Sequence, residues 1–407
     1  MVRFGRRVRT RVAARTRRSA AGLRTNEGLY HSICLSAHMI RIVPFTEQEL
    51  RATRAFNSRM RAGNAPTDFL LPEAPPAKRG APAPAVSTTQ FLAMEDEEAR
   101  GGFIELLHPA WLNGSVHPVA NYQSPLSEGI CDKKYGFVGM QMIRHMQQQR
   151  PYLFVVGMGD PANPLPRLLR ASNWTVFPVP FLFRVENAGR FLREIRTLRG
   201  SATKRIAASV AAFTGAGWLG VRGLRVLSIP AMVAAHRYSV EPLQKWGSWA
   251  DEVWQQFRGC CSFGVVRDTS TLDTLYPLGS GRTLAWMVKQ DGRPVGWATG
   301  LNTQMRDHKY FGNLRVGTVL DCVASPEAAR PVAWLAAQML AQAGVDVVLT
   351  NQQHSLLRNA FRQAGFFPGP SNYLLAISKR LSEQAAQGGG HDAIHITRGD
   401  GDGRIHL

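Results

Sequence analysis

Two stretches of this sequence match each other at a spacing of 192 residues (362 − 170, for example), and this repeat limits the fold more than any other feature. Five residues of the first stretch, Arg170, Trp174, Pro178, Phe181 and Leu182, correspond to Arg362, Phe366, Pro370, Tyr373 and Leu374. One face of a predicted helix repeats too, since Leu165, Leu168, Leu169 and Ser172 return as Leu357, Ala360, Phe361 and Ala364. Internal similarity at a fixed spacing indicates one structural unit used twice. A chain of 407 residues has room for two such domains.

The first copy of the repeat begins with a basic loop that contains glycine. The loop, Asp132–Gly139, reads Asp-Lys-Lys-Tyr-Gly-Phe-Val-Gly and leads into a segment whose apolar residues recur at helical spacing. Glycines at a helix entrance let backbone N–H groups approach an anion, and the helix dipole favours negative charge there. Because Lys133 and Lys134 lie beside the glycines, the loop predicts a phosphate-binding site.

A strand, a helix and a proline-punctuated strand are predicted after the loop. In the first copy these are Tyr152–Val156, Asn163–Ser172 and Val176–Val185, and in the second copy Asp346–Leu349 precedes a helix over Ser355–Gln363. Earlier segments of both copies alternate as antiparallel strands, namely Ile40–Val43, Gln90–Met94, Gly102–Leu107, Val116–Tyr122, Thr283–Val288, Arg293–Leu301 and Leu314–Ala324. Two further helices are predicted, one opened by a capping box at Thr46–Glu49 and one over Val332–Ala343. Asp291-Gly292 predicts a tight hairpin turn.

These elements predict five parts of the chain. Residues 1–38 form a basic extension, 39–190 a first domain, 191–235 a helical linker, 236–382 a second domain and 383–407 a flexible tail. The extension holds nine arginines and no acid in its first 24 residues, which suits a nucleic-acid arm or a presequence, but a disordered extension upstream of a start at Met39 is the plainer interpretation. In the tail, Asp400-Gly-Asp-Gly lacks the other ligands of a calcium loop, so a docked terminal strand or disorder is expected instead.

Charge and cysteine content narrow the class of protein. The net charge is +20, and +11 remains when the nine arginines are set aside (20 − 9), which suits an anionic ligand or a membrane surface. The segment 206–221 is too short and too rich in Ala and Gly to span a membrane; it is expected to be an interdomain helix or to lie on an anionic membrane surface. Five cysteines without metal-ligand spacing predict reduced thiols in a cytoplasmic protein without a metal.

The order of these elements resembles the GNAT acyl-CoA N-acyltransferase fold, and the duplication resembles a tandem pair of such domains. FemAB-type aminoacyl transferases show a similar arrangement. The resemblance covers roughly residues 39–382 and implies an α/β fold of two tandem GNAT-like domains, each a mixed, mainly antiparallel sheet flanked by helices. It also implies that the Arg/Gln-x-x-Gly-x-Gly/Ala loop of that superfamily, which binds the coenzyme A pyrophosphate, corresponds to Lys133, Lys134, Gly136, Phe137, Val138 and Gly139. The pantetheine arm would pass the splayed strands near Val155.

The sequence departs from the family pattern in three places. Val138 replaces a small residue of the loop, and the corresponding segment of the second copy, Ser325–Val332, has no glycine. The donor site is therefore expected in the first domain. The tyrosine that protonates the departing thiolate in this family is replaced by Leu169 in the first copy and by Phe361 in the second. Another group or water must then supply that proton, or the protein is not a catalyst.

Candidate site residues lie on the central strands. Glu105, His108, Tyr122 and Glu128 are candidate bases of the first domain, although strand alternation places Glu105 and His108 on opposite faces. For Glu105 a plain surface carboxylate is the alternative. Asp321 lies in an apolar run, where a carboxylate is costly unless it is paired or functional. Asn351 and His354 follow a strand end where this fold binds ligands, and helix capping is the alternative role.

The resemblance implies a bacterial-type cytoplasmic transferase that moves an acyl group from acetyl-CoA or another acyl-CoA to the amine of a small molecule. A sugar nucleotide or a cell-envelope precursor is the expected acceptor. Glu105, Tyr122 and Asp321 are its candidate catalytic residues, and Asn351 and His354 its candidate substrate-binding residues. Two alternatives stay open. One is a FemAB-like transferase that uses aminoacyl-tRNA, which would be the nucleic-acid partner, and the other is a non-catalytic, degenerate pair that serves as a scaffold.

Overall fold

The computed structural model describes residues 40–66, 69–75, 85–195 and 237–401. The predicted basic extension, nearly all of the predicted linker and the segment 206–221 lie outside these residues. We call residues 40–195 the first half and residues 237–401 the second half. In the described part of the chain, no helix is long and apolar enough to cross a membrane.

Among the described residues the first sheet has nine strands, and seven of them follow one another in the order β1-β2-β3-β4-β5-β15-β6. Their bounds are β1 Ile40–Pro44, β2 Ser87–Glu95, β3 Glu98–Leu112, β4 Ser115–Ser127, β5 Leu153–Val156, β15 Leu374–Ile377 and β6 Thr175–Pro178. Neighbouring strands are antiparallel except for β4 and β5, which are parallel. Two short strands extend this sheet, since β9 (Phe263–Val265) pairs with the end of β3 and with β16 (Ile394–His395).

The second sheet repeats the design of the first. Its order, read from the opposite edge, is β8-β10-β11-β12-β13-β7-β14, and only β12 and β13 are parallel. The strands are β8 Tyr238–Pro242, β10 Leu284–Gln290, β11 Arg293–Gln304, β12 Arg315–Ala324, β13 Val347–Asn351, β7 Phe181–Val185 and β14 Phe367–Gly369. The predicted turn between β10 and β11 is confirmed, because Asp291 and Gly292 both have positive φ (50° and 79°).

The two halves exchange one strand each. Strand β7 of the first half lies between β13 and β14, and β15 of the second half lies between β5 and β6. The spacing of 192 relates these two strands to each other, since Leu182 belongs to β7 and Leu374 to β15. The exchange is therefore reciprocal. The predicted boundaries 39–190 and 236–382 do not coincide with the sheets, because each sheet takes one strand from across the boundary.

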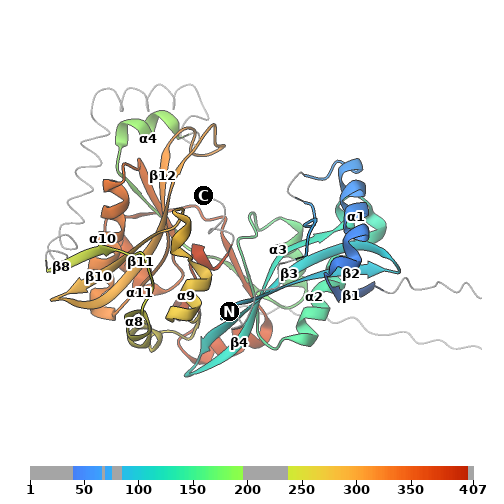
Figure 1. Cartoon of the computed structure of the whole chain (residues 1–407), viewed down its shortest axis with the longest axis horizontal. Helices are drawn as coiled ribbons and strands as arrows, with labels where there is room; N and C mark the ends of the chain where they lie inside the picture. The colour runs from blue at the N-terminus through green and yellow to red at the C-terminus, as the bar shows by residue number, and fades with distance from the viewer. Residues whose placement is uncertain (1–39, 67–68, 76–84, 196–236, 402–407) are drawn as a thin grey trace, which may run out of the picture. The chain divides into compact units, whose positions relative to one another are not determined.

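Helices cover both sheets (Figure 1). In the first half they are α1 Leu50–Ala62, α2 Val138–Gln149, α3 Pro164–Ala171 and α4 Ala188–Glu194. In the second half they are α8 Trp249–Arg258, α9 Thr269–Leu275, α10 Ala329–Gln342, α11 Ser355–Gln363 and α12 Lys379–Gln387. The predicted capping box is present, since Thr46 and Glu49 close the short 3-10 turn (Glu47–Glu49) that leads into α1. Phe56 and Met60 then bury the inner face of α1 completely.

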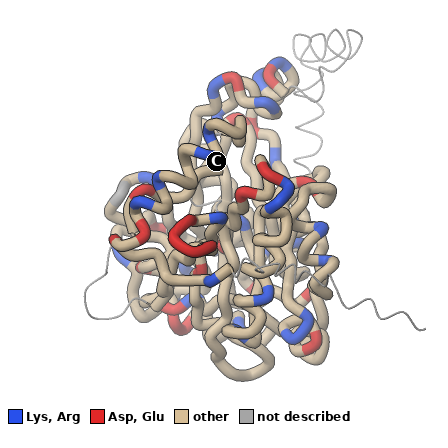
Figure 2. Tube along the Cα trace, turned by 90° about the vertical axis from the view of Figure 1, so that its right-hand side faces the viewer, with Lys and Arg blue, Asp and Glu red and all other residues tan. Residues whose placement is uncertain are grey.

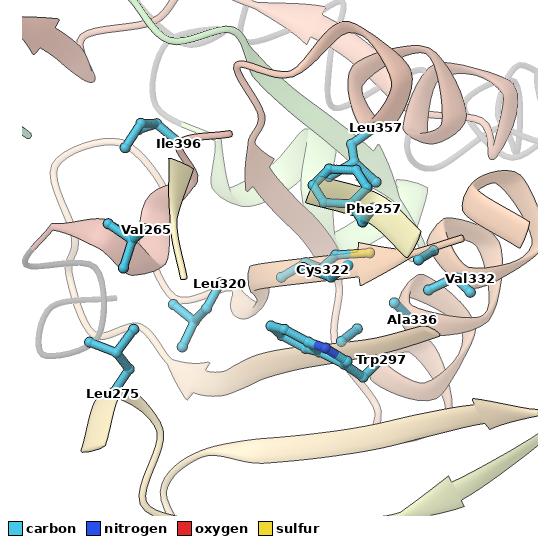
Figure 3. Close-up of a cluster of buried hydrophobic side chains, with 14 of the residues drawn as sticks. Phe257, Val265, Leu275, Trp297, Leu320, Cys322, Val332, Ala336, Leu357 and Ile396 are labelled. Carbon is cyan, nitrogen blue, oxygen red and sulfur yellow. The ribbon is translucent and has the colours of Figure 1, made fainter. Parts of the chain in front are cut away.

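Among the residues that the structure describes, four apolar clusters hold the elements together, and the largest spans both halves. It joins Phe154 of β5 to Phe257 of α8 and Leu357 of α11, and it includes Ile396 near residue 401. Figure 3 shows Phe257, Leu357 and Ile396. Burying one such side chain stabilises a fold by about 1.5–3 kcal/mol. A second cluster packs α2 and α3 against one face of the first sheet through Val138, Met142 and Leu169.

The C-terminal residues are folded as far as Gly401, so the predicted flexible tail is wrong for residues 383–401. Helix α12 continues to Gln387, and β16 pairs in parallel with β9 (Ile394 with Phe263). Ile394 and Ile396 are fully buried, and Thr397 and Asp400 form a capping box around a short turn. The Gly, Gln and Ala content suggested disorder, but two buried isoleucines and a capped turn outweigh it. The docked terminal strand is the alternative that the structure contains.

Candidate functional site

The loop between β4 and α2 consists of two short 3-10 turns, Glu128–Ile130 and Lys133–Tyr135. Lys133 and Lys134 are exposed at its surface. The backbone of Gly136 is helical (φ −58°), so its conformation does not require glycine. Gly129, which no sequence pattern singled out, is the glycine that the loop needs: a Cβ there would lie 2.7 Å from the carbonyl oxygen of Tyr135. The two turns can therefore stack only because Gly129 has no side chain.

The loop leads into the N-terminus of α2, which has no side-chain cap. Helix α2 begins at Val138, and the preceding Phe137 makes no side-chain hydrogen bond to its first turn. The side chain of Val138 is fully buried in the cluster beneath α2, so it does not cover the amides of the first turn. Backbone N–H groups at such a terminus carry a partial positive charge. With Lys133 and Lys134 next to them, these groups can hold an anion such as a diphosphate.

An ion network underneath fixes the shape of the loop. The buried carboxylate of Glu128 accepts hydrogen bonds from Arg59 Nε (2.6 Å) and from Arg100 Nη1 (3.1 Å). Arg100 also binds Glu95 (2.9 Å) and stacks on the ring of Tyr135 at 4.3 Å. Glu128 thus supports the loop. Its carboxylate, a candidate base in the sequence, is paired with two arginines.

Strands β4 and β5 part directly before this loop. They pair only at Ala120 with Leu153 and at Asn121 with Phe154. A bulge then shifts β4 against β3, and Ser124 adopts a positive φ of 46° within it. Beyond Asn121 the facing edges of β4 and β5 no longer pair with each other, so an extended ligand with amide groups could bind their backbone. The side chain of Val155 points into the core and is only 2% exposed, so only its backbone is available.

Tyr122 lies one residue past the last β4–β5 pair. Its ring packs on Phe103 at 4.9 Å, and its hydroxyl is buried without a hydrogen-bond partner among the residues that the structure describes. Burial raises the pKa of Tyr122 well above its ordinary value. The phenol therefore stays protonated and does not suit the base predicted from the sequence.

Glu105 is held in a buried ion pair. Its carboxylate accepts hydrogen bonds from Arg150 Nε at 2.5 Å and from Arg150 Nη2 at 3.3 Å, and only 3% of the residue is exposed. The alternative of a surface carboxylate is therefore wrong. Arg150 ends α2, so the pair lies under the C-terminal end of that helix, away from the loop. As predicted, His108 lies on the other face of β3, where its ring is 5.9 Å from Phe154.

Asp321 is fully buried at the centre of a second network. Its carboxylate accepts hydrogen bonds from Arg267 Nε (2.6 Å) and the Tyr276 hydroxyl (2.8 Å), and His395 Nε2 lies 3.4 Å away. Arg267 binds Asp400 as well, also at 2.6 Å. Burial alone would raise the pKa of Asp321, but Arg267 and the other neighbours outweigh it, so the pKa lies below its usual range. The carboxylate is paired inside the core, as the cost of burying it required.

Asn351 and His354 are both bound to other parts of the chain. Asn351 accepts a hydrogen bond from Arg398 Nη1 (3.1 Å). His354 caps α11, because its Nδ1 accepts from the N–H of Leu356 (3.3 Å) and its Nε2 lies 2.9 Å from the carbonyl oxygen of Cys260. Burial lowers the pKa of His354 to about 4, so the ring is neutral at physiological pH. Capping, the alternative role of His354, is the one that the structure contains.

Cys131, Cys260, Cys261 and Cys322 are free thiols. Within the described ranges, no three His, Cys, Asp or Glu side chains lie close enough together to hold a metal ion.

Comparisons with known proteins found similar solved structures at low sequence identity. No family model matches the chain, and no curated protein matches it. A probable N-acyltransferase from Enterococcus faecalis V583 is 11% identical with a TM-score of 0.46, over 84% of this chain and 73% of its own. A tandem GNAT protein from the clavulanic acid biosynthesis pathway is 12% identical with a TM-score of 0.43, over 84% and 99%. N-myristoyltransferase of Saccharomyces cerevisiae is 11% identical with a TM-score of 0.40, over 71% and 69%.

The chain's own topology defines the class. Each sheet runs through four antiparallel strands to one parallel pair, and a helix follows the fourth strand in both halves. The fold is that of two GNAT-like α/β units in tandem, as predicted from the sequence.

Proposed function

We propose that this protein transfers an acyl group from an acyl-CoA to an amine and that it binds the donor in its first half. One observation carries the proposal: β4 leaves β5 after Asn121, and the same strand runs on into the loop with the exposed Lys133 and Lys134 and the start of α2. A coenzyme A thioester has a diphosphate at one end and an arm with two amides at the other. The two parts of the site match those two parts of the ligand in order.

The outer end of the site supports this proposal through charge. The dipole of α2 places roughly half a positive charge at its N-terminus, and the two lysines add to it. Phe137 and Ile130 lie on the same loop and are 42% and 48% exposed. They offer an apolar surface beside the anion site, which would suit the ring of a nucleotide.

The inner end supplies orientation and a proton. The amine nitrogen attacks the thioester carbonyl carbon, the C–S bond breaks, and the departing thiolate takes up a proton. Tyr122 has an unpartnered hydroxyl at the parting of the strands, and we assign it as the donor of that proton. Glu105 and Glu128 are both paired with arginines, so we assign the proton lost by the amine to water.

The acceptor is proposed from the resemblance alone, as the amine of a sugar nucleotide or a cell-envelope precursor. An acyl-CoA donor and free cysteines both fit a cytoplasmic location. The tRNA-dependent alternative would need a broad basic surface. Along the chain trace in Figure 2, Lys and Arg are interspersed with Asp and Glu. That alternative predicts tight, salt-sensitive binding of tRNA.

The direct test is transfer itself. The full chain is incubated with acetyl-CoA and a panel of amino sugars, their nucleotides and small amines, and release of the coenzyme A thiol is measured. We expect release that depends on one class of amine and falls at least tenfold in Tyr122→Phe, with an unchanged KM for acetyl-CoA. Thiol release no faster than without protein, for every amine, would reject catalysis and favour the scaffold alternative.

A further inference from the structure

The second half contains the same parting of strands as the first. Strands β12 and β13 pair in parallel as far as Val319 with Thr350. A bulge then displaces Leu320 against β11, and β12 continues through Asp321. In the first half, the equivalent parting and bulge are where the proposed donor site lies. The second half therefore contains the framework of a second donor cleft.

A C-terminal segment, Ile396–Gly401, lies where β12 and β13 separate. On one side it extends β13, because Gln352 bridges to Thr397 and the N–H of Gln353 donates to the carbonyl oxygen of Ile396 (3.1 Å). On the other side it meets β12. A Cβ added to Gly399 would lie 3.3 Å from the carbonyl oxygen of Leu320 and 2.0 Å from the Tyr276 hydroxyl. The segment therefore lies against β12, and the Tyr276 hydroxyl leaves no room for a side chain at Gly399.

Arg267 holds the segment through a buried ion pair. Its guanidinium binds Asp321 on β12 and Asp400 in the segment, at 2.6 Å each, and all three residues are at least 98% buried. The other carboxylate oxygen of Asp400 accepts from the N–H of Thr397 (2.8 Å). Removing the segment would leave Asp321 and Arg267 facing an opened cleft with one partner lost, and a buried charge that loses its partner is strongly destabilising.

The loop of the second half agrees with a closed cleft. Its counterpart of the basic glycine loop, Ser325–Val332, contributes no lysine and no glycine, and Pro331 and Val332 are buried. It holds one exposed cation, Arg330, where the first loop has two lysines, so an anion is held less strongly there.

We infer that residues Thr397–Gly401 occupy the second half's counterpart of the donor cleft, so that each chain binds one acyl-CoA and binds it in the first half. This inference rests on the proposed function for the identity of the ligand. The segment also reaches the first cleft. Asn121 Nδ2 donates to the carbonyl oxygen of Asp400 (2.9 Å), and a Cβ on Gly401 would lie 2.8 Å from Val156. The segment that lies between β12 and β13 therefore also borders the place where β4 and β5 separate.

Hydrogen exchange measured by mass spectrometry on the full chain, with a parallel count of bound acetyl-CoA, tests this inference. The proteins are wild type, Gly136→Glu, which blocks the first loop, and Gly259→Glu as the matched control. Gly259 has nearly the same backbone conformation as Gly136 (φ −60° against −58°) and open space around it. The peptide that covers residues 394–401 reports whether the segment stays in place.

We expect one equivalent of acetyl-CoA in wild type and Gly259→Glu, none in Gly136→Glu, and slow exchange in residues 394–401 with or without acetyl-CoA. An equivalent retained by Gly136→Glu, with faster exchange in the segment, would overturn the inference and leave acyl-CoA binding intact. No binding by any of the three proteins would reject the proposed donor. In that case the exchange still decides whether the cleft is closed, because fast exchange in the segment would overturn closure and slow exchange would support it.

Discussion

Leu349 of β13 pairs with Phe183 of β7, a residue 166 positions earlier in the chain (349 − 183) and in the other copy of the repeat. Its counterpart in the first sheet is the pairing of Val156 in β5 with Leu375 in β15. Because each strand is held by hydrogen bonds on both edges in the foreign sheet, neither sheet can lose it without two new exposed edges. The two halves should therefore unfold together.

A protease site inserted between Ile195 and Tyr238 tests this coupling. After cleavage we expect the two fragments to elute together and to melt in a single transition close to that of the intact chain. Dissociation of the fragments under native conditions, or two separate transitions, would mean that the exchanged strands do not hold the halves together.

The buried network around Arg267 predicts a large loss of stability on a single change. Arg267→Met leaves Asp321 and Asp400 buried without their cation, and the expected cost is about 3–5 kcal/mol in urea unfolding. A triple variant that also carries Asp321→Asn and Asp400→Asn should recover much of that loss. Arg358→Met, which removes the more exposed pair with Asp392, is the control and should cost about 1 kcal/mol or less. Equal losses in both single variants would contradict this account.

His354 predicts a loss of stability in mild acid. Its pKa is about 4 in the folded protein and about 6.5 in an unfolded chain, so the folded state disfavours the proton. Stability from this group is complete above pH ~6.5 and declines as the pH falls toward ~4. His354→Asn can still cap the helix but cannot take up the proton, so its unfolding free energy should vary less over that range. Parallel curves for the two proteins would show that His354 does not titrate as described.

Lys133 and Lys134 predict that donor binding depends on salt. Both ammonium groups are exposed at the loop, so their attraction to a diphosphate is screened. The double variant Lys133→Ala/Lys134→Ala should raise the Kd for acetyl-CoA roughly tenfold at low salt, about 1.4 kcal/mol, and should flatten its salt dependence. Lys309→Ala/Lys379→Ala, which removes two lysines of the second half, should leave both unchanged. An equal effect of the two double variants would point to general charge and not to a site.

The repeat predicted much of this fold from the sequence. It paired the helix that contains Leu169 with the one that contains Phe361, and it aligned the segments that became β7 and β15. It did not predict their exchange, because a strand's sequence determines which face is buried and not which of two similar sheets accepts it. The length and path of the connection decide that, and neither is visible as a pattern.

The local structure of the candidate site was predicted in part. The loop and its lysines follow from local sequence, but the side chains that hold it do not, since Arg100 and Glu128 are 28 positions apart and Arg267 and Asp400 are 133 apart. One signal was available. Arg267 follows the apolar run Cys261–Val266, and Asp321 lies within another apolar run. Two opposite charges in apolar surroundings indicate a buried pair, and that reading would have moved Asp321 from the catalytic candidates to the core.

The central claim is that acyl-CoA binds at the loop of the first half, and isothermal titration of acetyl-CoA into three forms of the full chain tests it most directly. Wild type and Gly259→Glu should bind with the same Kd, whereas Gly136→Glu should bind at least a hundredfold more weakly, because a carboxylate then faces the diphosphate at the start of α2. Equal affinity in Gly136→Glu and wild type would place the donor elsewhere and contradict the account.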